Sequence, residues 1–409
     1  MAVMAGLVWC APMALADDNR GEHESHKGRG GTVGTCPAAA VPAPRCANTV
    51  AAAFGPDGRP VLAWAQRGHL YVARADERGA VTLPPTRVNA EAASIDDSGE
   101  GRPRVVEAGP GRILVSYVVR GETSTSGTLM FSRSEDDGRT FTMPVRLSDE
   151  ANPVSQRFAA LTASADGRVV AAWLDKRDAA AAWFEGARSG AAVYYALSTD
   201  GGRTFSPNTR LLDRTCECCR LGLALGDDGQ SVVMWRNIFG RNIRDHALAT
   251  IGRDGAAGPV HRVSEDNWAV DSCPHHGPAL SVAASGVYDA VWFTGVKARR
   301  GVYHARTTDG GRTFSAPLRL GGPDTPTSHP QVVSRGDSVV VAWKELLGDH
   351  VEIRSMTSSD GARTWSTPKR LAETNGASDH PQLLTDGQRV FLSWLTAAEG
   401  YRLLPVDQP

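Results

Sequence analysis

Short apolar segments that end in an aromatic residue recur along the chain at intervals of 51 to 62 residues. Each is preceded by a partner segment and by turn residues such as Asp57-Gly58 or Asp166-Gly167, a combination typical of β-hairpins. The segments are Val61–Trp64, Leu114–Tyr117, Val170–Trp173, Val232–Trp235, Ala290–Trp292, Val340–Trp343 and Phe391–Trp394. The pattern therefore predicts seven hairpins, each followed by a third strand and, in all but the last, by a fourth.

A second repeat lies outside these hairpins. It has Ser or Thr, then Asp two residues later, a Gly-rich turn, and Arg-Thr before an aromatic residue. The four copies are Ser134–Phe141, Ser198–Phe205, Thr307–Phe314 and Ser358–Trp365. Each copy follows a β-prone run and precedes a short strand, so we expect the Asp carboxylate to accept backbone N–H groups within a turn. The closing aromatic residue is expected to pack under the sheet.

These turns resemble the Asp boxes of the sialidase and bacterial neuraminidase repeat families, and the resemblance covers most of the chain. It implies a β-propeller in which the boxes lie on the face away from the ligand. We therefore expect an all-β fold, with one propeller of seven blades over residues 46–409. Six blades, as in the true sialidases, are the alternative if the terminal hairpins merge. The seventh hairpin lacks a fourth strand, which a segment around Thr32–Pro37 would supply.

The N-terminus has a different composition from the rest. Residues 1–16 are apolar and end in Ala14-Leu-Ala16, which predicts a signal peptide, and residues 17–45 are rich in Gly, Pro and polar residues, which predicts a flexible segment. The expected location is therefore periplasmic or secreted. With 44 basic and 45 acidic residues the net charge is −1, so charge favours neither nucleic acid nor an anionic membrane as a partner. No later apolar run suggests a membrane span.

Cysteine and histidine residues recur just before the predicted first strands. Cys216 and Cys273 both lie 19 residues before the aromatic residue of their hairpin, and His329 and His380 both lie 14 residues before theirs. Because the entries to the first strands meet at one end of a propeller channel, we expect these side chains to line its mouth. The predicted metal ligands are Cys216, Cys218, Cys219, Cys273, His275, His276, His329 and His380. Arg102, Arg157 and Arg236 have the same register and are candidates for binding an anion.

Thiolate and imidazole ligands select copper(I) and zinc(II). Copper is the preferred cofactor, because a partly exposed, cysteine-rich site in an exported protein suits copper handling; zinc is the alternative. A periplasmic metal donor or acceptor protein is the expected partner. The competing interpretation is structural: six cysteines of an exported chain permit 15 disulfide pairings, and Cys36 with Cys46 is the favoured bridge. In that interpretation His329 and His380 would have only a structural role, as capping residues at the start of the first strands of their blades.

Sialidase chemistry, which the family resemblance implies, needs three arginines, a Tyr–Glu nucleophile pair and an acidic proton donor. The aromatic-Arg-Ile-Pro sequence of the family is missing, and only Arg102, Arg157 and Arg236 with Glu399 and Tyr401 imitate the required set. We therefore assign no catalytic residue and expect metal handling rather than catalysis. An exo-sialidase-type glycoside hydrolase and a metal-free propeller that binds carbohydrate or protein are the alternatives.

Overall fold

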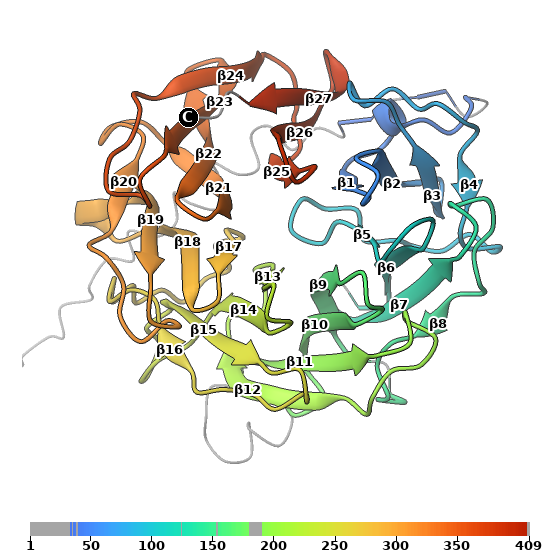
Figure 1. Ribbon diagram of the computed structural model, residues 1–409, viewed down its shortest axis with the longest axis horizontal. Helices are drawn as coiled ribbons and strands as arrows, with labels where there is room; N and C mark the ends of the chain where they lie inside the picture. The colour runs from blue at the N-terminus through green and yellow to red at the C-terminus, as the bar shows by residue number, and fades with distance from the viewer. Residues whose placement is uncertain are drawn as a thin grey trace, which may run out of the picture.

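A computed structural model describes residues 33–406 apart from 35, 38–39, 124, 153 and 180–189. The predicted signal peptide and residues 17–32 of the N-terminal segment lie outside the described residues. Seven antiparallel sheets form a ring around a central axis, as Figure 1 shows. The prediction of an all-β propeller with seven blades is confirmed.

The strands follow one another outward within each blade. Blades one and two contain β1 (Val50–Phe54), β2 (Pro60–Gln66), β3 (His69–Arg74), β4 (Thr86–Arg87), β5 (Arg104–Glu107), β6 (Ile113–Arg120), β7 (Gly127–Ser134) and β8 (Val145–Arg146). Blades three and four contain β9 (Gln156–Ala163), β10 (Val169–Asp175), β11 (Ala191–Ser198), β12 (Thr209–Thr215), β13 (Gly222–Leu225), β14 (Ser231–Arg236), β15 (His246–Ile251) and β16 (His261–Arg262).

Blades five to seven contain β17 (Ala279–Ala284), β18 (Val287–Thr294), β19 (Gly301–Thr307), β20 (Leu318–Leu320), β21 (Thr327–Arg335), β22 (Ser338–Leu347), β23 (His350–Ser358), β24 (Lys369–Thr374), β25 (Gln382–Thr385), β26 (Val390–Thr396) and β27 (Gly400–Val406). The short 3-10 helices η1 (Pro44–Cys46) and η2 (Lys297–Arg299) lie outside the sheets. In the part of the chain that is described, no helix has the length and apolar character needed to span a membrane.

The recurring aromatic residues all lie on the second strand of their blade and are buried. They are Trp64, Tyr117, Trp173, Trp235, Trp292, Trp343 and Trp394. Trp173 of blade three, for example, shares an apolar cluster with Leu114 and Phe131 of blade two. Truncating such a side chain to Ala costs about 3–5 kcal/mol. The hydrophobic core is therefore a ring of contacts between neighbouring blades, and the central channel is left to loops and inner strands.

The four repeated turns join the third and fourth strands of blades two, three, five and six. In the first copy, Asp136 accepts the backbone N–H of Thr140 at 2.9 Å and its hydroxyl at 2.6 Å, and Ser134 Oγ accepts the N–H of Gly138 at 2.9 Å. The other three copies repeat these bonds. Because neighbouring strands are antiparallel, these turns lie at the opposite end of the blades from the entries to the first strands.

The ring closes between blades seven and one. The seventh sheet has three strands, and the described part of the N-terminal segment adds no strand to it, so the expected closing strand is not found there. Instead Val33 packs with Trp64 and Leu395, and the N–H of Leu403 on β27 donates to the carbonyl of Arg78 in blade one. Cys36 and Cys46 form a disulfide next to this seam. Side-chain packing and the disulfide therefore hold the seam where a strand was expected.

Candidate metal centres at the channel mouth

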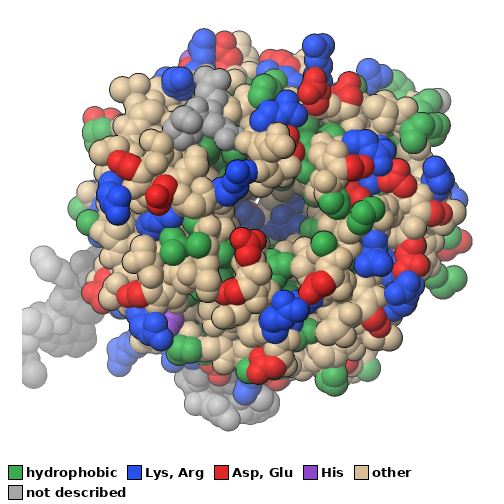
Figure 2. Space-filling view, in the orientation of Figure 1, with side chains coloured by type: hydrophobic (Ala, Val, Ile, Leu, Met, Phe, Trp, Pro, Cys, Tyr) green, Lys and Arg blue, Asp and Glu red, His purple; other side chains and the backbone are tan. Residues whose placement is uncertain are grey.

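The segments that enter the inner strands meet at the channel mouth. Figure 1 shows β5, β13, β17, β21 and β25 facing the axis, and Figure 2 shows a hollow at the centre of the ring with Lys or Arg side chains inside it. The segments 216–220 and 273–277 lead into β13 and β17, His329 lies at the start of β21, and His380 precedes β25. Within the described residues five of the predicted ligands lie in two compact groups, one of thiols (Cys216, Cys218 and Cys219) and one in which His329 and His380 lie beside Glu100.

The thiol group contains Cys216, Cys218 and Cys219, all buried and unoxidised. The sulfur atoms of Cys216 and Cys218 are 3.6 Å apart, those of Cys218 and Cys219 are 3.9 Å apart, and all three lie within 4.8 Å of one another. Cys216 directly follows β12, where its N–H donates to the carbonyl of Arg236 at 2.9 Å, and a turn brings the next two thiols back toward it. Cys273, which lies in the segment that enters blade five, is exposed, and its side chain hydrogen-bonds with that of Cys218.

The sulfur spacing fits a single metal ion. Thiolates bound to zinc at about 2.3 Å in a tetrahedron are about 3.8 Å apart, and a three-coordinate ion with similar bonds separates them by about 4 Å. The 3.6 and 3.9 Å separations match both arrangements, whereas a disulfide needs about 2.05 Å. The group therefore offers the donor set and the spacing of a soft-metal site.

Positive charge next to the sulfurs favours thiolate. Arg244 donates from Nη1 to Cys216 Sγ at 3.3 Å, and Arg236 lies nearby. Hydrogen bonding with Cys218 and Cys219, together with these two guanidinium groups, holds the pKa of Cys216 well below its ordinary value despite burial. Hydrogen bonding with Cys218 likewise lowers the pKa of Cys273 to about 7. The metal-binding thiolate form is thus favoured at Cys216 and Cys273, whereas hydrogen bonding with Cys216 raises the pKa values of Cys218 and Cys219.

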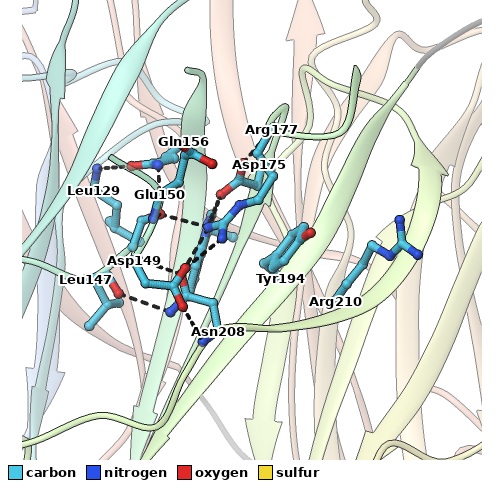
Figure 3. Close-up of polar contacts among 12 residues, drawn as sticks. Leu129, Leu147, Asp149, Glu150, Gln156, Asp175, Arg177, Tyr194, Asn208 and Arg210 are labelled. Carbon is cyan, nitrogen blue, oxygen red and sulfur yellow. Dashed lines mark hydrogen bonds and ion pairs between the residues drawn. The ribbon is translucent and has the colours of Figure 1, made fainter. Parts of the chain in front are cut away.

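A neighbouring loop of blade three is anchored beside the thiols. Arg177 donates from Nη1 to Asp149 at 2.6 Å and from Nη2 to Asp175 at 2.8 Å, and its guanidinium lies 4.2 Å from the ring centre of Tyr194 (Figure 3). Although burial opposes it, pairing with these carboxylates raises the pKa of Arg177. The preceding residue, Lys176, forms an ion pair with Glu217 inside the thiol segment. The Arg177 network therefore fixes a loop that contacts the thiol segment from the neighbouring blade.

The imidazole group brings together rings from three blades. The ring centres of His329 and His380 are 3.5 Å apart and those of His276 and His329 are 4.8 Å apart. The pairing of β21 with β22 is interrupted between Ser328 and Gln331, and His329 takes a left-handed φ of 49°. Such bulges change the direction in which a side chain points. This one lies at His329, whose imidazole reaches the channel mouth. Burial, followed by neighbouring imidazoles and cations, lowers the pKa values of His329 and His380 well below the ordinary value.

Glu100 joins the loops of the mouth, and the sequence analysis missed it. Its Oε2 accepts the N–H of Arg220 at 2.8 Å and that of Gly277 at 2.9 Å, while its Oε1 accepts Arg220 Nη1 at 2.5 Å. His380 Nδ1 lies 3.6 Å from the same Oε1. The flanking Gly99 allows the approach, since a Cβ there would lie 2.4 Å from His380 Cε1. The sequence does contain a signal for Glu100: it is an acidic residue between two glycines, just before the first strand of a blade.

The three candidate arginines are already paired within the protein. Arg102 binds Asp379 at 2.5 Å and Arg157 binds Asp96 at 2.7 Å, while Arg236 donates to the carbonyls of His276 and Phe293, both at 3.0 Å. These contacts position mouth loops and inner strands. Each of these guanidinium groups thus has acceptors within the protein, and anion binding by the three arginines stays a prediction.

Three other expected side chains lie elsewhere. Tyr401 packs with Trp64 at the closing seam and bonds Ser393 at 2.9 Å, while Glu399 Oε2 accepts the hydroxyl of Thr396 at 2.6 Å. The imitation of a Tyr–Glu nucleophile pair is therefore not formed. His275 is exposed and is in neither group of candidate ligands.

No protein-family model and no curated protein sequence matches this chain. Among solved structures, an ulvan lyase bound to a glucuronic acid–sulfated rhamnose fragment has a TM-score of 0.59 at 11% identity, covering 87% of this chain and 91% of the lyase. An α-L-arabinanase of Penicillium chrysogenum has a TM-score of 0.48 at 11% identity, covering 88% and 92%. The NanB sialidase of Streptococcus pneumoniae has a TM-score of 0.47 at 9% identity, covering 86% and 82%. The likeness to the lyase shows a shared propeller fold.

Proposed function

We propose that this propeller binds one soft metal ion through Cys216, Cys218, Cys219 and Cys273 and takes part in metal handling. The observation that carries the proposal is the spacing of the three buried sulfurs, 3.6 and 3.9 Å for the two closest pairs, which is the spacing of thiolates on one ion. Copper(I) is the first choice of metal and zinc the alternative, since thiolates select both. The imidazole group is not needed for this site.

The unequal exposure of the four thiols favours copper(I) and a role in exchange. Three sulfurs are buried, which suits a three-coordinate copper(I) ion shielded from water, whereas Cys273 is exposed at the rim. A structural zinc site would enclose all four ligands. An exposed fourth thiol gives a ligand of another protein a way to reach the ion. The proposed partner is therefore a metal donor or acceptor in the periplasmic or secreted compartment.

The test is a competition between the protein and a copper(I) chelator under anaerobic, reducing conditions. Cys218→Ser combined with Cys219→Ser removes two of the three buried sulfurs, and we expect high-affinity copper(I) binding to be lost while the propeller stays folded. Asp213→Asn, at an exposed position of the preceding strand β12, leaves every cysteine unchanged and is the matched control. Unchanged affinity of the double variant refutes the site, and its unfolding favours a structural role for these cysteines.

Carbohydrate processing is the second candidate, favoured by the fold shared with the ulvan lyase. Fold likeness at 11% identity carries no residue roles to this chain. For sialidase-type hydrolysis in particular, the arginines are paired and the Tyr401 hydroxyl bonds Ser393 at the closing seam, so the required groups are not assembled. A screen of the purified protein against anionic polysaccharides and sialosides, with and without added metal, separates this candidate from metal handling.

A further inference from the structure

We propose that the channel mouth holds a second metal site, separate from the thiols, in which His329, His380 and Glu100 bind a borderline divalent cation such as zinc or copper(II). One ligand atom from each of these residues lies within 4.8 Å of the other two. None of them belongs to the thiol group, so this site does not depend on the proposed copper(I) function. Imidazole and carboxylate ligands suit divalent ions, whereas copper(I) selects the thiols.

The first argument is the state of the imidazoles. His329 is 8% exposed, and the Nδ1 atoms of both His329 and His380 lack a hydrogen bond in the described structure. A buried nitrogen without a partner costs about 1–3 kcal/mol, so buried polar groups are normally satisfied. Two stacked imidazole rings that each have an Nδ1 atom without a partner therefore need an explanation. A bound cation provides one, because it accepts the lone pair of each nitrogen.

The second argument is that the backbone is built to hold the rings together. The bulge in β21 gives His329 a left-handed conformation, and Gly99 leaves room for His380 against the loop that carries Glu100. Arg220 and Gly277 hold the Glu100 carboxylate in place. Two nitrogens bound to zinc at about 2.0–2.1 Å are about 3.3 Å apart, so ligands within 4.8 Å need to close by roughly 1.5 Å or less. The two rings, which stack with 28° between their planes, must also turn so that a nitrogen of each points at the same ion.

The charges around the site set its expected affinity. Glu100 pairs with Arg220 and Asp379 pairs with Arg102, so each of these cations has a matching carboxylate. Lys344, bound by Ser378 Oγ at 2.8 Å, adds a positive charge that acts on both imidazoles. It repels a divalent cation without contributing a ligand. Removing this charge with Lys344→Met should therefore tighten zinc binding at pH 7, where Lys344 still carries its proton although burial lowers its pKa to about 8.

The experiment counts zinc ions on the full chain by calorimetry and elemental analysis. We expect the parent to bind two equivalents, the Cys218→Ser, Cys219→Ser variant to keep one, and His329→Gln with His380→Gln in that background to bind none. His261→Gln, on outer strand β16, is the matched control and should change nothing. Lys344→Met should bind the imidazole-site ion more tightly, a gain that a purely structural histidine pair does not predict.

The proposal is overturned if the cysteine variant binds no zinc, or if the histidine changes leave its one equivalent intact. Should the histidine variant misfold, the parent protein supplies the answer through diethylpyrocarbonate modification read by mass spectrometry. Zinc should then protect His380, whose side chain is 22% exposed, and leave exposed His275 reactive. Equal modification of His380 with and without zinc refutes the site. These measurements follow zinc at the imidazole site, whereas the copper(I) assay follows the thiols. A negative copper(I) result therefore does not change what the zinc measurements mean.

Discussion

Replacing Glu100 by Ala should destabilise the whole propeller, because this carboxylate joins loops from several blades. Glu100 is 4% exposed and Arg220 is 7% exposed, so the change leaves a buried guanidinium without its carboxylate and two backbone N–H groups without an acceptor. Breaking one partner out of a buried ion pair costs about 3–5 kcal/mol. With an unfolding entropy of about 2.1 cal/mol/K per residue over roughly 370 ordered residues, 4 kcal/mol lowers Tm by about 5 °C.

A double-mutant cycle separates the ion pair from general damage. Glu100→Ala, Arg220→Met and the double variant are compared by differential scanning calorimetry and chemical denaturation at pH 7. The two single changes should each cost several kcal/mol, and the double change should cost at least about 2 kcal/mol less than their sum. Glu77→Ala, an exposed glutamate on the outside of blade one, is the control. Additivity within about 0.5 kcal/mol, or a Glu100→Ala cost below about 1 kcal/mol, refutes the reasoning.

Two further predictions concern the repeated turns and the alternative activity. Hydrogen bonds from Thr140 lower the pKa of Asp136 to about 2, so its stabilisation is complete above about pH 4 and is lost as the pH falls toward 2. The difference in Tm between the parent and Asp136→Asn should therefore shrink over that range, with exposed Asp324→Asn as control; a constant difference contradicts it. Fluorogenic sialosides should not be cleaved above background, since the three arginines are paired and the hydroxyl of half-buried Tyr401 bonds Ser393. Turnover abolished by Tyr401→Phe would reverse the ranking of the two functions.

The sequence alone determined the fold, because both of its repeats are local. Each aromatic residue on a second strand and each Asp in a repeated turn is specified within about ten residues, and each such unit packs only on its neighbours. The same register indicated which entry segments meet at the mouth, since chain direction alternates from strand to strand. The register of the repeats by itself therefore singles out Cys216, Cys218, Cys219, His329 and His380.

Only the tertiary structure decided how those side chains are grouped. Whether thiols and imidazoles form one cluster or two depends on the directions of the side chains and on contacts between blades. Neither of these can be read from the spacing of residues along the sequence. The role of Glu100 illustrates this: the two backbone N–H groups that donate to its carboxylate belong to Arg220 and Gly277, 120 and 177 positions away, and only the closed ring brings them together. The closing seam is similar, because packing of Val33 and the contact of Leu403 with Arg78 become favourable only when the first and last blades meet. Local patterns specify the blades, and long-range electrostatics and ring closure specify the site.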